Sequence, residues 1–504
     1  MPSLTGADMR TEKLSEHRPK WRCVAKLSGW RSACAVFLLC AATAAASPAQ
    51  TFKTLVDFNG RNGAFPGSVV QGTDGNFYGT SEGGASSNCF VAGGCGTVFK
   101  LTPNGALTTL YNFCAQPNCA DGGFPSAELV QATDGNFYGT TFSGGSGSNL
   151  TICGSLGCGT VFKLTPAGAL TTLYNFCAQA NCSDGANPRA GLVQATDGIF
   201  YGTALDAGNT TCNAPFGCGT IFKITRAGNF ATLHRFDSTE GTCPAAGLLQ
   251  AIDGNFYGTT TSGGGCNGSV FKITPGGKLT TLSLGVAAPS GLVQAADGNF
   301  YGTTYFGGTG NYGTVFKITP NGTLTTLYSF CAQTKCTDGA FPYVGLIQAT
   351  DDNLYGTTSY GGTFGPGTVF KTNSAGTLTT LHNFDSTDGN QPAWLVQGTD
   401  GAIYGTTSKG GAAHHGTVFS LSVGLGPFVE TRPTSGKVGA NIIILGNNLT
   451  GTTSVTFNST AATFTVVGSS EITTTVPVGA TSGTVQVTTP GGTLLSNVAF
   501  QVKP

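Results

Sequence analysis

Charged residues are scarce in this chain of 504 residues, at 10% of the sequence, against roughly 25% in an average soluble domain. Hydrophobic residues reach 39%, so the composition is not that of a disordered chain, which is more polar. After residue 46 no basic run occurs, and 17 basic and 21 acidic residues leave a net charge of −4. Nucleic-acid binding needs a basic footprint, so no nucleic-acid partner is expected.

Helical periodicity and the common catalytic motifs are also missing. No segment repeats apolar residues convincingly at every 3.6 positions. The sequence contains no nucleophile elbow, phosphate-binding loop or metalloprotease motif. It therefore predicts an all-β protein, and it indicates no catalytic residue, no cofactor and no metal site.

The first 46 residues have the pattern of a signal peptide. Seven basic residues precede an apolar run that extends from Ala33 to about Ala46 and ends in small residues suited to cleavage. The run is shorter than the ~18 residues that span a bilayer, and no second apolar run follows. We therefore predict export, an extracellular or cell-surface location, and no integral membrane segment in the mature chain.

Cysteine is plentiful, and fourteen of the 17 cysteines lie beyond residue 46. Twelve of them form six local pairs with four or five residues between the partners. Zinc sites typically use gaps of two to four residues and often add histidines, so disulfides are favoured over metal binding. The cysteines expected in disulfides are Cys89, Cys95, Cys114, Cys119, Cys153, Cys158, Cys177, Cys182, Cys212, Cys218, Cys243, Cys266, Cys331 and Cys336.

One short phrase, an apolar residue followed by Tyr-Gly-Thr, occurs seven times at spacings between 44 and 63 residues. Such a period is typical of repeat proteins, whose units bury their apolar faces against one another. The tyrosines of the phrase are Tyr78, Tyr138, Tyr201, Tyr257, Tyr301, Tyr355 and Tyr404.

Each repeat predicts four strands. In the second unit they are rich in β-branched and aromatic residues and cover residues 129–133, 136–141, 159–165 and 170–176. Asp134-Gly135 predicts a two-residue hairpin turn with positive φ at both positions, and Pro166-Ala167-Gly168 predicts a second tight turn. Four strands repeated seven times indicate a seven-bladed β-propeller across residues 47–425.

Ring closure is predicted from the two ends of the repeat region. Residues 52–58 have the sequence of a fourth strand without the three strands that should precede it, and the last unit ends at its third strand, residues 416–420. We expect the early strand to complete the last blade, because closure removes exposed sheet edges.

Residues 426–504 contain neither the repeat nor cysteine. Short alternating runs separated by turn residues predict a small β-sandwich there. The runs lie at 442–445, 454–457, 463–467 and 484–488.

The repeat resembles the bacterial GloVer tandem repeat, found in exported and surface proteins called choice-of-anchor proteins. The matching residues in the second unit are Phe137-Tyr138-Gly139-Thr140-Thr141, Gly144-Gly145 and the segment from Gly159 to Pro166. Equivalent residues recur through about 370 residues. The resemblance implies an exported repeat protein and, because the family has no established activity, it implies no catalytic residue.

The tail resembles an IPT/TIG domain, an immunoglobulin-like module. The match rests on Pro433-Thr434-Ser435-Gly436, Val455-Thr456-Phe457 and the segment from Ile472 to Pro477. The resemblance implies a spacer or interaction domain in an exported bacterial protein.

A binding site must break the symmetry of the repeat. Trp394 and Glu128 stand before the first strand of their units, where the other units have glycine, serine or alanine, and Asp206 is a further unrepeated acid. Long variable loops usually carry binding residues. We therefore expect Trp394, Glu128 and Asp206 near the face that carries these loops.

The leading hypothesis is a secreted or cell-surface, non-catalytic protein that binds an extracellular glycan or protein. The alternative is an extracellular polysaccharide hydrolase or lyase, with Glu128 or Asp206 as acid or base. Convergence of unrepeated acidic residues in one pocket would favour the alternative.

Overall fold

The computed structural model describes residues 50–84, 93–147, 149, 151–209, 212, 215–261 and 268–503; the expected signal peptide lies outside them. Strands dominate these residues, and no helix among them is long and apolar enough to cross a membrane. The all-β prediction is therefore confirmed. The described helices are short 3-10 turns, η1 (Pro117–Cys119), η2 (Gly154–Leu156), η3 (Ala180–Cys182) and η4 (Thr334–Cys336).

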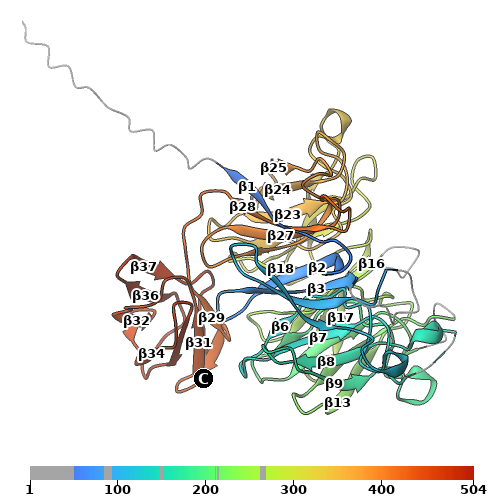
Figure 1. Cartoon of the computed structure of the whole chain (residues 1–504), viewed down its shortest axis with the longest axis horizontal. Coiled ribbons are helices and arrows are strands. Elements are labelled where there is room, and N and C mark those ends of the chain that lie inside the picture. Colours follow the sequence, from blue (N-terminus) through green and yellow to red (C-terminus); the bar gives the residue numbers. More distant parts are fainter. Residues whose placement is uncertain are drawn as a thin grey trace, which may run out of the picture. The chain divides into compact units, whose positions relative to one another are not determined.

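Seven antiparallel sheets of four strands each follow one another through the described part of the repeat region, in a propeller-like arrangement (Figure 1). Sheet 1 contains β2 (Ala64–Gln71), β3 (Phe77–Gly83), β4 (Thr97–Leu101) and β5 (Leu107–Asn112). Sheet 2 contains β6 (Val130–Gln131), β7 (Phe137–Thr141), β8 (Thr160–Leu164) and β9 (Leu170–Asn175). Sheet 3 contains β10 (Val193–Gln194), β11 (Phe200–Ala204), β12 (Thr220–Ile224) and β13 (Phe230–Arg235). Sheet 4 contains β14 (Leu249–Gln250), β15 (Phe256–Thr260), β16 (Gly268–Ile273) and β17 (Leu279–Val286).

The remaining sheets repeat this plan, and the last one borrows a strand from the start of the chain. Sheet 5 contains β18 (Val293–Gln294), β19 (Phe300–Thr304), β20 (Thr314–Ile318) and β21 (Leu324–Ser329). Sheet 6 contains β22 (Ile347–Gln348), β23 (Leu354–Thr358), β24 (Thr368–Thr372) and β25 (Leu378–Asn383). Sheet 7 contains β26 (Asn390–Gln397), β27 (Ile403–Lys409), β28 (Thr417–Ser422) and β1 (Thr51–Asp57).

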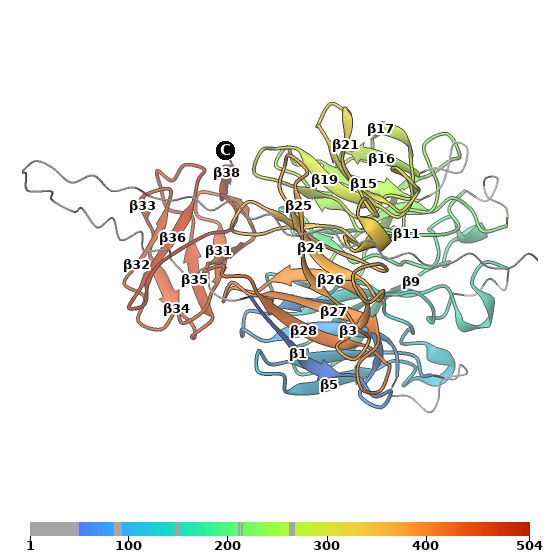
Figure 2. The ribbon, with the colours of Figure 1, turned by 90° about the horizontal axis from the view of Figure 1, so that it is seen from above.

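β1 pairs antiparallel with β28, in a register that places Thr51 opposite Ser422 and Asp57 opposite Thr417. Figures 1 and 2 show blue β1 beside orange β28. The predicted pairing between the early strand and the last repeat is therefore confirmed.

A closed series of hydrogen bonds also links each sheet to the next. The threonine after Tyr-Gly donates from Oγ1 to a carbonyl just before or within the first strand of the following sheet, as Thr140 does to Ala190 at 2.9 Å. Thr406 of sheet 7 donates to Gly67 of sheet 1, so the series returns to its start. The donors are Thr80, Thr140, Thr203, Thr259, Thr303, Thr357 and Thr406. The repeated phrase thus recurs because its hydroxyl joins neighbouring sheets.

The apolar core lies between neighbouring sheets. The ring of Tyr138 packs on Phe200 of the next sheet with 4.2 Å between ring centroids. Tyr404 of sheet 7 packs on Phe77 of sheet 1 in the same way, at 4.1 Å. All four rings are almost completely buried, so each sheet gains its core only from its neighbours.

The connections define two faces of the repeat region. Turns between first and second strands and between third and fourth strands share the tight-turn face. Loops between second and third strands, and from each fourth strand to the next sheet, share the loop face. Antiparallel strands reverse direction at every connection, so the strand order alone places the tight turns and the longer loops on opposite faces.

The Asp-Gly turns differ from the prediction. Gly135 donates its N–H to the carbonyl of Ala132 at 2.9 Å, and Gly135 has a positive φ of 79° whereas Asp134 does not. The Asp134 carboxylate instead accepts hydrogen bonds from Asn136 N and Tyr138 OH. The two-residue hairpin with positive φ at both positions is therefore wrong; the connection is a type I turn followed by glycine.

The tail contains two four-stranded sheets over one apolar core. The first sheet contains β29 (Glu430–Arg432), β31 (Asn441–Leu445), β35 (Glu471–Thr475) and β34 (Phe464–Val466). The second contains β33 (Thr460–Ala461), β32 (Ser454–Phe457), β36 (Val485–Thr489) and β37 (Gly492–Leu495). β30 (Ser435–Lys437) and β38 (Gln501–Lys503) form a parallel pair. Buried residues of both sheets, such as Ile444 and Val487, share this core, which is the arrangement of a β-sandwich.

Candidate functional site

A cavity of about 710 Å³ opens on the loop face, and residues in the seven sheets or in the loops beside them line its wall. Its volume lies in the range of roughly 300–1,000 Å³ that is usual for small-molecule sites. Two positions of the repeat supply much of the wall. The first is the segment just before the first strand, which in sheets 1 and 7 lies inside the longer strands β2 and β26; the second is the residue that follows Tyr-Gly-Thr-x. The residues at the second position are Glu82, Leu205, Thr261, Tyr305, Ser359 and Ser408.

Aromatic side chains gather where sheets 5 and 6 form the wall. Tyr305, Tyr343 and Tyr360 line the cavity. The ring centroid of Tyr305 lies 5.9 Å from that of Tyr343 and 5.2 Å from that of Phe341, which lies 6.0 Å from Tyr360. Tyr343 is 54% exposed and Tyr360 is 43% exposed. Mutual contacts thus support these rings while part of their surface stays open to a ligand.

Two hydrogen bonds orient the tyrosines at the mouth of the cavity. Arg189 donates from Nη2 to the Tyr343 hydroxyl at 2.9 Å, and Gln391 donates from Nε2 to the Tyr360 hydroxyl at 2.7 Å. Arg189 precedes the first strand of sheet 3, whereas Tyr343 precedes that of sheet 6. The first bond therefore joins two sides of the cavity wall that are 154 residues apart in sequence.

Trp394 lines this cavity, and Glu128 is not among the described lining residues. The Glu128 side chain uses space that Gly191 leaves, whereas the Trp394 ring lies at ordinary contact distance from Gly291. A Cβ atom added to Gly291 would lie 3.8 Å from the Trp394 ring, and one added to Gly191 would come within 2.5 Å of Glu128 Cγ. The Glu128 side chain is exposed to water, yet partial desolvation by the surrounding protein raises the pKa of its carboxyl.

Asp206 lies next to the wall residue Leu205 but is not itself among the described lining residues. Its backbone pairs with Ala186, and desolvation raises the pKa of its carboxyl to about 6. Of the three predicted binding residues, the structure therefore places Trp394 on the cavity and Glu128 and Asp206 away from its wall.

The cavity tyrosines were not predicted from the sequence. The available signal was the variability of this position, where the fifth unit has Tyr305, the second unit another aromatic residue, and the other units small, aliphatic or acidic residues. Among the other unrepeated residues, Glu82 and Arg189 line the cavity, whereas Glu240 bonds His234 at 2.7 Å.

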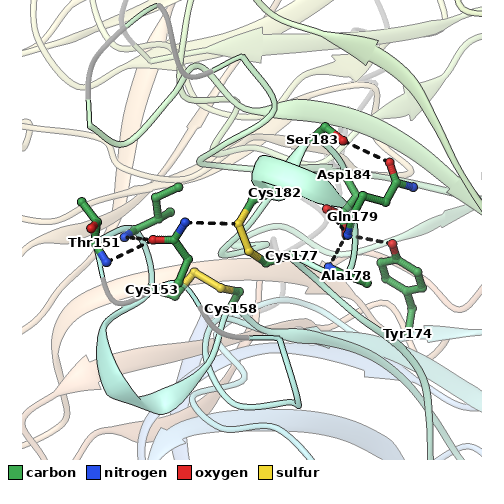
Figure 3. Close-up of a disulfide and its surroundings, with 12 residues drawn as sticks. Thr151, Cys153, Cys158, Tyr174, Cys177, Ala178, Gln179, Cys182, Ser183 and Asp184 are labelled. Atoms are coloured by element: carbon green, nitrogen blue, oxygen red, sulfur yellow. Dashed lines mark hydrogen bonds between the residues drawn. A yellow bond between two sulfur atoms is a disulfide. The ribbon is translucent and has the colours of Figure 1, made fainter.

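Disulfides brace the loop face. Five of the expected bridges are present in the described residues: Cys114–Cys119, Cys153–Cys158, Cys177–Cys182, Cys212–Cys218 and Cys331–Cys336. Figure 3 shows Cys153–Cys158 close to Cys177–Cys182, and all four of these cysteines pack in one core cluster. Cys89 and Cys266 lie outside the described residues, so the bridges expected to involve them, with Cys95 and Cys243, stay predictions.

A buried acid organises each loop that carries a bridge after the fourth strand. Asp184 accepts hydrogen bonds from Tyr174 OH at 2.8 Å and from the N–H groups of Ala178 and Gln179 (Figure 3). Asp121 and Asp338 make the equivalent bonds with Tyr111 and Tyr328. Where histidine replaces this tyrosine, the pairs His234–Glu240 and His382–Asp388 form at 2.7 Å, so these histidines stabilise loops.

The tight-turn face repeats one polar arrangement. Each tyrosine of the repeated phrase donates its hydroxyl to the turn aspartate, as Tyr257 does to Asp253 at 3.0 Å. In the sixth unit Asp351 accepts this bond, and Asp352 takes the left-handed position of glycine with φ 60°. Lysines of the third strands pair with the same aspartates in Lys100–Asp74, Lys163–Asp134, Lys272–Asp253 and Lys317–Asp297.

One group of described residues has the spacing of metal ligands. The sulfur atoms of Cys95, Cys114 and Cys119 lie within 4.8 Å of one another. Cys114 and Cys119 are joined in a disulfide, and metal binding requires thiolates. In this oxidised form the group does not fit a metal ion.

The repeat region matches one family model in three consecutive segments. The model is the Gloeobacter/Verrucomicrobia repeat, and the matches cover residues 42–153, 150–284 and 283–466. The chain belongs to this family. The matched segments span all seven repeats and extend into the tail.

The solved structures similar to this chain match it at low sequence identity and with TM-scores below 0.5. A fungal alcohol oxidase of the AA5 family, in complex with copper, is 13% identical over 90% of this chain and 99% of its own, with a TM-score of 0.48. An extracellular domain assigned to a hybrid two-component system of B. thetaiotaomicron is 11% identical over 90% of this chain and 58% of its own, with a TM-score of 0.45. The PQQ-bound aldose sugar dehydrogenase of Streptomyces coelicolor is 12% identical over 74% of this chain and 98% of its own, with a TM-score of 0.39. No activity is transferred from them, and no curated protein matches the sequence.

Proposed function

We propose that this protein is a non-catalytic binding protein that takes an extracellular glycan into the cavity of the loop face. The observation that carries this proposal is the set of exposed aromatic rings, with Arg189 and Gln391, at unrepeated positions of the cavity wall. Aromatic faces pack on the apolar faces of sugar rings while polar groups at the rim bind hydroxyls. The repeated residues already form the strands and turns of each unit, so the stability of the fold does not require these unrepeated side chains.

The proposed scaffold is a closed seven-bladed β-propeller, residues 47–425, followed by an immunoglobulin-like IPT/TIG module, residues 426–504. The return of the threonine series to Gly67 and the pairing of β1 with β28 support closure. Two sheets over a common core support the second module. Export through residues 1–46 accords with the disulfides, which persist in oxidising compartments.

The alternative is a hydrolase or lyase that acts on extracellular polysaccharide. Glycoside hydrolysis typically uses two carboxyl groups that flank the scissile bond. Among the described residues that line the cavity, Glu82 is the single acid. The raised pKa of Asp206 suits a general acid, but its position off the wall favours binding over hydrolysis.

Binding and turnover can be measured together on a panel of oligosaccharides with the mature protein. We expect binding of at least one glycan without release of shorter products, and a loss of about 10-fold or more in affinity for Trp394→Ala and for Tyr305→Ala. Tyr201→Phe on the tight-turn face is the matched control and should bind as the unchanged protein does. Product release would favour the enzyme, whereas binding of no glycan would refute the proposal.

A further inference from the structure

Arg189 is the one cationic side chain among the described residues that line the cavity. It is exposed, and its hydrogen bond in the described structure goes from Nη2 to the neutral hydroxyl of Tyr343. A guanidinium group carries five N–H donors in a planar fork. Four of these donors therefore make no hydrogen bond to the described residues.

Among the described residues, no acidic side chain forms an ion pair with Arg189. In the described part of the chain, repeated lysines pair with turn aspartates, and Arg432 pairs with Glu430 at 2.8 Å. Glu82 lines the same cavity as Arg189, yet no ion pair joins them among the described salt bridges. The guanidinium is thus held in position by a tyrosine hydroxyl while its charge is left for a ligand.

Aromatic rings face the same space as this charge. Tyr305 and Trp394 line the cavity from sheets 5 and 7, and both side chains are only partly buried. Tyr305 packs edge-to-face on Tyr343, the partner of Arg189. The wall therefore presents a planar cation beside ring surfaces that suit the apolar face of a pyranose.

We infer that the ligand is an acidic glycan, in which Arg189 binds the carboxylate of a uronic acid residue and Tyr305 and Trp394 pack against its sugar ring. This inference rests on the proposed function and adds the chemical class of the ligand. Arginine and carboxylate form two parallel charge-assisted hydrogen bonds, which fix the orientation of the carboxylate plane. Neutral sugars cannot use this fork in the same way.

The test compares a galacturonic acid oligomer with the same oligomer after its carboxyl groups are reduced to alcohols. Calorimetry on the mature protein should give a dissociation constant that is 10 to 100 times larger for the reduced oligomer than for the acidic one. Arg189→Gln should weaken binding of the acidic oligomer by a similar factor and weaken binding of the reduced oligomer much less. Arg189→Lys keeps the charge but loses the fork, so it should fall between the two.

Further measurements distinguish a carboxylate ligand from other anions. They also distinguish failure of this inference from failure of the proposed function. Equal binding of the acidic and reduced oligomers by the unchanged protein would overturn the carboxylate assignment but leave glycan binding intact. Tighter binding of a sulfated oligosaccharide would overturn it in favour of a sulfate. Binding of poly-glutamate that depends on Arg189 but not on Trp394 would indicate an acidic peptide and refute both. Failure of acidic and neutral glycans alike to bind would also refute both.

Discussion

On the tight-turn face all seven repeats present the same pair, a tyrosine hydroxyl on an aspartate, whereas on the loop face no two sheets contribute the same set of residues to the cavity. Uniform turns suit a role in stability, because each tyrosine–aspartate hydrogen bond holds only the turn of its own unit. A variable wall on a rigid scaffold can serve recognition. Under the proposed function, the tight-turn face serves stability and the loop face carries the binding site.

Two carboxyl groups, one on each face, have pKa values that are shifted in opposite directions. On the tight-turn face burial alone would raise the pKa of Asp253, but hydrogen bonds from Lys272, Asn255 and Tyr257 outweigh it and lower the pKa to about 2. On the loop face Asp206 has only the desolvation, which raises its pKa to about 6. Desolvation without a hydrogen-bonding or charged partner therefore makes ionised Asp206 a locally unfavourable group.

The largest expected effect comes from removing the strand that completes sheet 7, on which both faces depend. Deleting residues 47–58 removes Val56 and Phe58, which are buried, and exposes the edge of β28. At about 1.5–3 kcal/mol for each side chain, unfolding should become easier by roughly 3–6 kcal/mol, with self-association at the free edge. Thermal melting and size-exclusion chromatography measure both, and deletion of residues 47–49 alone is the control. An unchanged melting temperature in a monomeric product would contradict ring closure.

Loss of one disulfide should affect the loop face by a smaller amount. The double change Cys177→Ser with Cys182→Ser opens a loop that is much shorter than 15 residues, so it should cost less than ~3 kcal/mol of unfolding free energy. The oxidised mature protein should carry seven disulfide bridges. Thiol alkylation followed by mass spectrometry counts the free cysteines that remain. More than two free thiols would contradict the disulfide framework.

A matched pair of tyrosine changes separates the faces directly. Tyr138→Phe removes a buried ring's hydrogen bond to Asp134 at 2.8 Å and should cost about 1.5–3 kcal/mol, as bonds to charged groups do. Tyr305→Phe removes a hydroxyl of a partly exposed ring at the cavity and should change stability by less than about 0.5 kcal/mol. Urea unfolding measures both variants. An equal loss of unfolding free energy in the two variants would contradict the distinction between the faces.

The smallest effects concern pH, and their signs are opposite. The folded pKa of Asp206 lies above its unfolded value, so the contribution of Asp206 to stability falls as pH rises from about 4 to 6. Asp206→Asn should therefore raise the unfolding free energy by about 1–2 kcal/mol at pH 7 and change it little at pH 4. The folded pKa of Asp253 lies below its unfolded value, so its contribution exists above pH ~4 and is lost toward pH 2. Its side chain is 38% exposed, and solvent screening limits the loss in Asp253→Asn to about 1 kcal/mol or less. Unfolding curves at pH 3, 4 and 7 would contradict this account if both variants shifted in the same direction.

The sequence predicts the strands and their closure because these depend on local patterns. Tyr138 and Thr140 recur with fixed neighbours, and the unit-to-unit bonds follow from that spacing. The type of the Asp-Gly turn could not be predicted, because the bond from Tyr138 to Asp134 decides the backbone path. Periodicity carries no such information.

The cavity wall was only partly predictable. Trp394 stood out as an unrepeated residue before a first strand, and it lines the cavity. Glu128 occupies the equivalent position in its unit but fills the space above Gly191 instead. The contact of Arg189 with Tyr343 joins loops of sheets 3 and 6, and the paths of irregular loops decide it.

Hydrogen–deuterium exchange across the whole chain, with and without a bound acidic oligosaccharide, tests the division between the two faces most directly. We predict slower exchange in peptides that contain residues 303–306, 341–345 and 389–395, which include wall residues of the cavity. Peptides of the tight turns, such as residues 134–137 and 253–256, should exchange at an unchanged rate. Protection of the tight turns, with unchanged exchange around the cavity, would contradict the account.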